Sequence, residues 1–397
     1  MRTAAGFANL APPLGEPLDG KGKPLTPPAP AGWTWYEIAG AVCRDGSPTG
    51  FFVHDGSANK LLIYLEGGGM CSNASFCSFN PANANQVLSG DGQTVLGTAL
   101  GAISGRQQPG VYTQADHTGP PRGIFDFQDA RNPVRDWTQI YVPYCTGDVH
   151  FGSRKNGSVP GLDHQQFVGH LNMRLFMSRI VPTFQGKVSQ VLLTGANAGG
   201  FGAALNLSMV QDAFGDTQVD ALSDSGPPMD DKYMPVCMQK LWRDSWGFDD
   251  SLPPDCESCR QADGGGLLKI ADYLFMKHPS THFGMISSLE DEVIRLAYSV
   301  GANNCANSDT ADPILLSVAQ LVDPNILMPA SEFTKGLVAL RDAYRATGRL
   351  ATFYKGGAAP NYDQHLFRPD FYETVNGTTL AQFTADFLGG GVTQVGP

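Results

Sequence analysis

The sequence feature that most constrains the fold is an apolar run at residues 190–194 that continues directly into Gly-Ala-Asn-Ala-Gly-Gly at residues 195–200. Such a run predicts a buried strand, and the small residues permit a sharp strand-to-helix turn that projects one side chain above a sheet. In the G-x-S-x-G form of this turn that side chain is serine. Here it is Asn197, whose neutral amide cannot be converted into a nucleophile by loss of a proton to a histidine.

Further apolar runs of strand length occur at residues 61–65, 139–144, 219–222, 283–286 and 350–354. Apolar residues at helical spacing lie between some of them: Phe167, Leu171 and Leu175, then Phe333, Leu337, Leu340 and Tyr344, with Ser331 as the expected N-cap and Gly348 as the expected end. This alternation predicts an α/β fold with a mostly parallel sheet and helices on both faces. Ligands of such sheets bind at the carboxyl ends of the strands.

The domain organisation follows from composition. With 397 residues and 42% hydrophobic content, the chain can bury a large core. Prolines concentrate near the start, so we expect residues 1–34 to form an extended leader and residues 35–397 to form a single domain. The stretches around 71–136 and 229–266 lack clear periodicity and are expected to be insertions that shape a pocket.

The formal net charge of −11 argues against nucleic acid or an anionic membrane as a partner, because both select basic surfaces. It also weakens a simple electrostatic attraction to polygalacturonate. No run approaches the ~20 apolar residues that a transmembrane helix needs.

The cysteines favour an oxidising compartment, since their number is even and the chain is rich in glycine and proline. They are Cys43, Cys71, Cys77, Cys145, Cys237, Cys256, Cys259 and Cys305. The C-x-x-C at 256–259 could belong to a zinc site, but no second pair completes four ligands, so a disulfide is favoured. We expect a secreted or periplasmic protein, although no signal peptide pattern is visible in this chain.

Three consecutive glycines follow the run at 61–65. Glycine leaves backbone N–H groups uncovered, which is how an oxyanion hole is built on hydrolase sheets. Gly68 and Gly69 are the expected donors, with the N–H of Ala198 as the third. Alone, such a glycine run indicates only a loop; the elbow pattern that follows it strengthens the interpretation.

The expected chain order of the remaining partners is nucleophile, acid, histidine. His365 follows the last apolar run and is the expected general base. Two residues qualify as the acid that orients it. Asp291, after the run at 283–286, is favoured, and Asp224, after the run at 219–222, is the alternative and would otherwise brace the elbow.

These residues give the chain a family resemblance over roughly residues 35–390. It resembles the pectin acetylesterase and Notum family of α/β-hydrolase carboxylesterases. The resemblance rests on Leu-Glu-Gly-Gly-Gly-Met-Cys at 65–71 with Cys77 close behind, Tyr-Cys-Thr-Gly-Asp-Val-His at 144–150, the 195–200 stretch, Asp291 in a Leu-x-Asp-Glu context, and His365.

The resemblance implies hydrolysis of small acyl esters from glycans or, in the Notum branch, of a fatty acyl ester from a protein. It implies a triad of serine at position 197, Asp291 and His365, and an oxyanion hole of Gly68, Gly69 and Ala198. It suggests the disulfides Cys71–Cys77 and Cys43–Cys145 and leaves the other four cysteines open. No metal or organic cofactor is implied. Acylated small molecules, polysaccharides and polyesters all fit these catalytic parts as substrates.

Asn197 departs from the family pattern, and three explanations stay open. The serine was replaced by design, the chain is a natural pseudoenzyme that binds acylated glycan or lipid without cutting it, or Asn197 has another use such as deamidation to an aspartate nucleophile.

A function of another class is a polysaccharide-binding module. Its stacking platforms would be Trp33, Trp35 and Tyr36, or Trp242 and Trp246. Packing of these aromatic residues in the core or a linker is favoured over that role.

Overall fold

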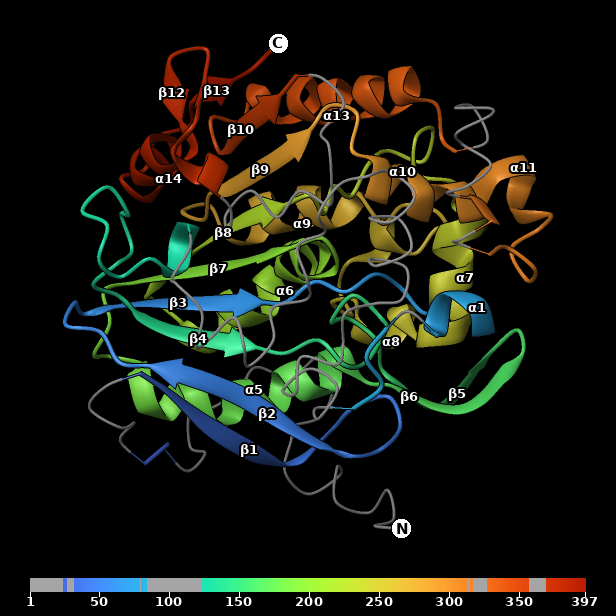
Figure 1. The fold of residues 1–397 in the computed structure, drawn as a ribbon, viewed down its shortest axis with the longest axis horizontal. Coiled ribbons are helices and arrows are strands. Elements are labelled where there is room, and N and C mark those ends of the chain that lie inside the picture. Colours follow the sequence, from blue (N-terminus) through green and yellow to red (C-terminus); the bar gives the residue numbers. More distant parts are fainter. Residues whose placement is uncertain are drawn as a thin grey trace.

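The computed structural model describes residues 24–26, 32–78, 80–83, 123–312, 315–316, 327–356 and 369–397. A nine-stranded sheet runs through the molecule in the order β1-β2-β4-β3-β7-β8-β9-β10-β13 (Figure 1). Its strands are β1 (Trp33–Val42), β2 (Pro48–His54), β3 (Lys60–Leu65), β4 (Thr138–Val142), β7 (Gln190–Ala196), β8 (Gln218–Asp224), β9 (Phe283–Ser288), β10 (Leu350–Lys355) and β13 (Gln394–Val395).

The strands from β4 to β13 are parallel, whereas β2 pairs antiparallel with both β1 and β4. Parallel strands are buried on both faces, which is why they read as continuous apolar runs in the sequence. All six strands predicted from such runs are present. Their carboxyl ends meet at one edge of the sheet, on the right in Figure 1.

Helices cover both faces of the sheet, as predicted. Side chains alternate along each strand, so Ile63 joins one apolar cluster and Tyr64 the other. The helices α5 (Gly169–Phe184) and α6 (Ala198–Phe214) pack in the first cluster and lie behind the sheet in Figure 1. The second cluster includes α14 (Leu380–Leu388).

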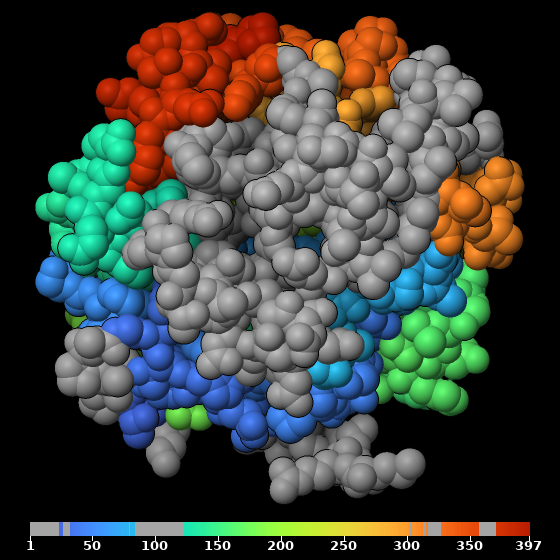
Figure 2. All heavy atoms as spheres, in the orientation of Figure 1, coloured from blue at the N-terminus to red at the C-terminus, as the bar shows by residue number. Residues whose placement is uncertain are grey.

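The remaining elements are short or peripheral, and those labelled η are 3₁₀ helices. They are α1 (Ala74–Cys77), η2 (Gly123–Phe125), β5 (Arg154–Val159), β6 (Leu162–Phe167), α7 (Val236–Trp246), α8 (Phe248–Ser251), η3 (Glu257–Cys259), α9 (Lys269–Lys277), α10 (Glu292–Tyr298), η4 (Ser299–Gly301), α11 (Ala302–Cys305), α13 (Ala330–Arg345), η7 (Pro369–Tyr372), β11 (Thr374–Val375) and β12 (Thr378–Thr379). In Figure 2 the residues of β1 and β2 lie at the lower margin of the visible face and the C-terminal residues at its upper margin. Within the described ranges, no helix has both the length and the apolar character needed to cross a membrane.

Several local predictions need correction. β1 begins at Trp33, two residues inside the expected leader. Phe167 ends β6 rather than starting a helix, and α5 begins at Gly169. Ser331 lies inside α13, whose N-cap is Pro329 with no side-chain cap. The helix ends at Arg345, before Gly348. The stretch at 229–266, expected to be irregular, contains the 11-residue helix α7.

All eight cysteines form disulfides: Cys43–Cys145, Cys71–Cys77, Cys237–Cys305 and Cys256–Cys259. The first two are the pairs that the family resemblance suggests. Because Cys256 and Cys259 are bonded to each other, the zinc alternative for this C-x-x-C is wrong. Four disulfides fit an oxidising compartment.

Candidate active site

The turn between β7 and α6 places Asn197 alone between strand and helix. Asn197 has φ 55° and ψ −117°, a conformation that residues with a side chain rarely adopt. Its N–H donates to the carbonyl oxygen of Asp224 at 2.8 Å, which ties the turn to the end of β8. A Cβ at Gly199 would lie 1.9 Å from the carbonyl oxygen of Leu65, so only glycine lets β3 approach this closely. The geometry is that of a nucleophile elbow.

The glycine loop after β3 lies against this elbow. A Cβ at Gly67 would lie 2.5 Å from the carbonyl oxygen of Ala196, and Gly69 has φ 81°. The N–H of Gly69 donates to Oδ1 of Asn197 at 3.2 Å. A predicted oxyanion donor and the residue at the nucleophile position are thus in direct contact. Ala198 opens α6, so its N–H is among the four that have no partner within the helix.

The favoured acid, Asp291, lies three residues beyond the end of β9 and is 2% exposed. Its Oδ1 accepts hydrogen bonds from the N–H groups of Val293 and Ile294, both at 2.9 Å, and so caps α10. These bonds hold the carboxylate at the carboxyl edge of the sheet.

The alternative acid, Asp224, is the last residue of β8 and is fully buried. Its Oδ1 accepts a hydrogen bond from Oγ of Ser225 at 3.3 Å, and its main-chain oxygen accepts the N–H of Asn197. Asp224 therefore braces the elbow through its backbone, which is the role considered for it besides that of the acid. His365, the expected base, lies outside the described residues.

Two buried ionisable residues, Asp148 and His150, follow β4, and His150 contacts the residue that precedes the glycine loop. Nε2 of His150 lies 2.8 Å from the carbonyl oxygen of Glu66, so this nitrogen carries the ring proton and donates it. Burial lowers the pKa of His150 to about 4 and raises the pKa of Asp148 to about 6. The hydroxyl of Thr146 donates a hydrogen bond to Asp148 at 2.6 Å, and the N–H of Gly169 donates another at 2.7 Å. Both bonds stabilise the carboxylate and so oppose the rise in its pKa.

Two residues that contact the loop were not singled out as site residues by sequence reasoning. Tyr144 was named only as the first residue of the 144–150 motif and was given no role in the site. Asn80 gave no signal, because its contact with the loop is tertiary and follows no local pattern. Their hydroxyl and amide groups bind the carbonyl oxygens of Gly69 and Gly68 respectively.

The aromatic platforms of the binding-module alternative are largely packed. Trp242 and Trp246 are 1% and 0% exposed and stack on each other with ring centroids 5.2 Å apart, so the core interpretation is confirmed for this pair. Trp35 is partly buried against Phe52, at 4.8 Å between ring centroids. Trp33 packs near Phe125 at 5.9 Å.

The sheet order, its parallel core and the elbow between β7 and α6 define an α/β-hydrolase-like fold. The family model described as Pectinacetylesterase matches residues 35–263, more than half of the chain. The chain belongs to the pectinacetylesterase family.

Curated relatives are identical to this chain at about a quarter of the aligned positions. It is 26% identical over 202 residues to the palmitoleoyl-protein carboxylesterase NOTUM of Mus musculus, covering 48% of this chain and 34% of that protein. It is 25% identical over 192 residues to pectin acetylesterase 5 of Arabidopsis thaliana, covering 47% and 39%. The matches thus span between a third and two fifths of the relatives' own length.

A solved structure with the same fold is that of the Wnt deacylase Notum from Drosophila. The TM-score is 0.57 with 20% identity, and the match covers 90% of this chain and 93% of that chain. At this identity the likeness establishes the fold alone.

Proposed function

We propose that this protein is a secreted serine-type carboxylic ester hydrolase scaffold whose reaction is suppressed by Asn197. Serine at this position would attack the acyl carbon while His365 takes its proton and Asp291 holds the imidazole. The N–H groups of Gly68, Gly69 and Ala198 would stabilise the oxyanion. The imidazolium would give that proton to the alcohol oxygen as the ester C–O bond breaks, and the alcohol would leave. Water would then attack the acyl-enzyme with the histidine again as base, and the histidine would return the proton to the serine oxygen as the acid is released.

The observation that carries this proposal is the contact between Gly69 and Asn197. A glycine N–H aimed at the side chain on the elbow is the arrangement that an acyl-transfer site needs. The buried cap position of Asp291 at the neighbouring carboxyl edge supports it. Membership in the pectinacetylesterase family supports the same chemistry.

We propose acetyl esters on a glycan such as pectin as the substrate. The matching family description and the relative called pectin acetylesterase 5 favour this acyl group. A polyester or a lipidated protein is the alternative, and the relatives called palmitoleoyl-protein carboxylesterase favour the latter. Four disulfides support secretion.

A second candidate is a non-catalytic protein that binds acylated glycan or lipid. It is favoured by the same hydrogen bond, because the amide oxygen of Asn197 uses the N–H of Gly69 as a reacting carbonyl oxygen would. The side chain at the elbow then occupies the hydrogen-bond donor of Gly69 and cannot attack an acyl carbon.

The substrate is tested with the Asn197→Ser variant by measuring acetate released from acetylated pectin. Fatty acid released from a palmitoleoylated peptide is measured beside it. We expect acetate release well above that of the parent chain and little fatty acid. The reverse preference would move the assignment to lipidated proteins. Binding of acetylated pectin by the parent chain, with no hydrolysis by Asn197→Ser, would favour the non-catalytic candidate.

A further inference from the structure

The glycine loop is held by two side chains that bind its carbonyl oxygens. Nδ2 of Asn80 donates to the carbonyl oxygen of Gly68, and the hydroxyl of Tyr144 donates to that of Gly69 at 3.0 Å. A trans peptide is planar, so the carbonyl of Gly68 and the N–H of Gly69 point in opposite directions. Fixing the Gly68 carbonyl with Asn80 therefore aims the Gly69 N–H to the other side, where Asn197 accepts it. The bond from Tyr144 fixes the next peptide, Gly69–Met70, and so holds Gly69 from its other end.

We propose that Asn80 and Tyr144 are positioning residues that set the direction of the Gly69 N–H, and hence of the oxyanion donor. The catalytic part of this inference rests on the proposed function. The orientation of the N–H itself does not.

Both side chains lie directly against the loop. A Cβ at Gly68 would meet the ring of Tyr144 at 2.7 Å, and a Cβ at Gly69 would meet Nδ2 of Asn80 at 2.9 Å. The ring and the amide thus occupy the space that side chains on the loop would fill. The loop cannot shift toward them without collision.

Tyr144 is itself held at three points. Its N–H donates to Oε2 of Glu66 at 2.8 Å, and its hydroxyl accepts the N–H of Val149 at 2.9 Å while donating to Gly69. The side chain is fully buried. Burial, reinforced by the charge of Asp148, raises the pKa of Tyr144 well above its usual range. The phenol therefore keeps its proton and remains a donor.

Asn80 is held through its backbone by a buried arginine. The guanidinium of Arg44 donates to the carbonyl oxygens of Asn80 at 3.1 Å and of Cys77 at 2.9 Å. The disulfide between Cys71 and Cys77 closes the same segment. A second disulfide, Cys43–Cys145, is adjacent in sequence to both Arg44 and Tyr144 and so links the two supports of the loop. Asn80 and Tyr144 are called the clamp residues below.

The test compares Tyr144→Phe and Asn80→Ala in the Asn197→Ser background. Tyr354→Phe is a matched control, because the buried hydroxyl of Tyr354, on β10, donates to the carbonyl oxygen of Leu337, in α13, at 3.1 Å. Asn132→Ala is the control for Asn80→Ala, because Nδ2 of Asn132 donates to the main-chain oxygens of Ile124 and Asp126.

With p-nitrophenyl acetate we expect each clamp variant to lose ~10²-fold in kcat with KM nearly unchanged, as when one oxyanion donor is misaligned. The controls should lower the unfolding midpoint and leave kcat per folded molecule unchanged. A purely structural role predicts that clamp and control variants behave alike, and that result would overturn the inference.

A second readout does not depend on hydrolysis. In the parent chain, amide hydrogen exchange at Gly69 reports the bond to Asn197. Tyr144→Phe and Asn80→Ala should accelerate it at least ~10-fold, while the controls leave it unchanged. If Asn197→Ser is inactive but exchange responds, the proposed function fails and the positioning inference stands. Unchanged exchange in both clamp variants would refute the inference whatever the activity.

Discussion

The N–H of Gly69 donates a hydrogen bond to the side-chain oxygen of Asn197 at 3.2 Å. This contact joins the loop after β3 to the elbow before α6, across 128 residues of sequence. A serine at position 197 has no amide oxygen to reach this donor. Replacing the asparagine should therefore supply a nucleophile and release the N–H for a substrate oxygen in a single step.

Asp291→Asn in the Asn197→Ser background should lower kcat by roughly 10⁴-fold with little loss of stability. Asparagine keeps an oxygen that can cap α10 but loses the charge that orients and stabilises the imidazolium. Asp291→Ala should cost in addition about 1 kcal/mol of unfolding free energy, because the cap is lost. Steady-state kinetics and urea unfolding check both expectations.

Asp224→Asn is the matched comparison for the acid. Its main-chain bond to Asn197 survives the substitution, so we expect a much smaller loss of kcat than for Asp291→Asn. A larger loss of kcat for Asp224→Asn than for Asp291→Asn would show that Asp224 is the acid of the triad.

Gly199→Ala should destabilise the protein by about 3 kcal/mol or more. The added Cβ would lie 1.9 Å from the carbonyl oxygen of Leu65, and backbone on both sides would have to move. Gly356→Ala is the control, since nothing lies within 4 Å of its added Cβ. Equal unfolding free energies for the two variants would contradict the close packing of β3 against the elbow.

Acid should destabilise the fold through its buried histidines. Burial lowers the pKa of both His150 and His170 from 6.5 to about 4. Between these values the unfolded chain binds protons that the folded chain excludes, so stability is complete above pH 6.5 and is lost as pH falls toward 4. Each histidine contributes at most about 3 kcal/mol to this loss.

Asp148 acts in the opposite sense, because its pKa is raised from 3.8 to about 6. The stability that it contributes is present below pH 3.8 and is lost as pH rises through 6. Urea unfolding across the window should show that His170→Gln loses less stability on acidification than the parent chain. The exposed His164→Gln should follow the parent, and parallel curves for all three would contradict the assignment.

The four disulfides should contribute unequally. Cys43–Cys145 closes a separation of 102 residues and Cys256–Cys259 one of only 3. On the chain-entropy model, replacing the first pair by serine should cost about 3 kcal/mol more than replacing the second. Thermal or urea unfolding of the two double variants tests the difference, and equal costs would contradict it.

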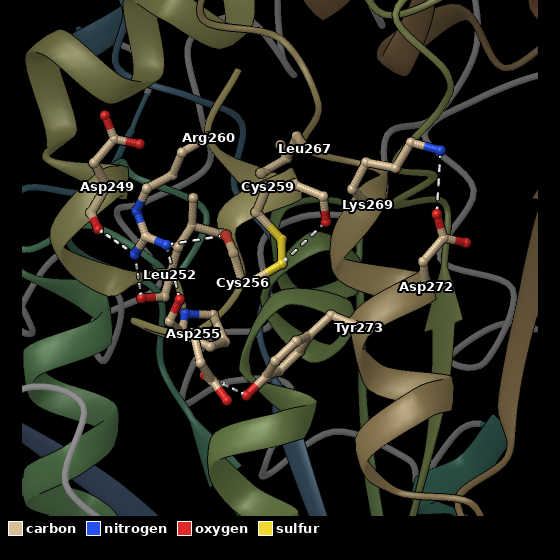
Figure 3. Close-up of a disulfide and its surroundings, with 12 residues drawn as sticks. Asp249, Leu252, Asp255, Cys256, Cys259, Arg260, Leu267, Lys269, Asp272 and Tyr273 are labelled. Carbon is tan, nitrogen blue, oxygen red and sulfur yellow. Dashed lines mark hydrogen bonds and ion pairs between the residues drawn. A yellow bond between two sulfur atoms is a disulfide. The ribbon is translucent and has the colours of Figure 1, made fainter. Parts of the chain in front are cut away.

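The short Cys256–Cys259 turn has a second support that does not need the disulfide. Arg260 donates to the carbonyl oxygens of Asp249 at 3.0 Å and Leu252 at 2.8 Å (Figure 3). It also donates to the carbonyl oxygen of Pro253 at 2.8 Å. These bonds should hold the turn after the sulfurs are replaced. They are a further reason to expect a small cost for this pair.

The sequence predicted the parallel strands because burial on both faces makes them continuous apolar runs. It missed β1, because a partly exposed antiparallel strand mixes polar and apolar residues. It missed β2 because the apolar run of this largely buried strand is only three residues long, at 51–53. It missed α7 because the stretch at 229–266 shows no clear helical periodicity, although Trp242 and Trp246 are four residues apart and both are buried in this helix.

The candidate site was predictable where its chemistry is local. The elbow at Asn197 and the glycine loop each follow one strand, so each leaves a contiguous pattern in the sequence. The contacts of Asn80 and Tyr144 with that loop join segments distant in sequence, and only the folded chain brings them together.

The role of position 197 is tested by comparing hydrolysis of p-nitrophenyl acetate by the parent chain and by Asn197→Ser, with His365→Ala added to the serine variant. We expect the serine to raise the rate at least ~10³-fold and the loss of the histidine to remove that gain. A folded Asn197→Ser protein with no more activity than the parent chain would contradict the esterase assignment.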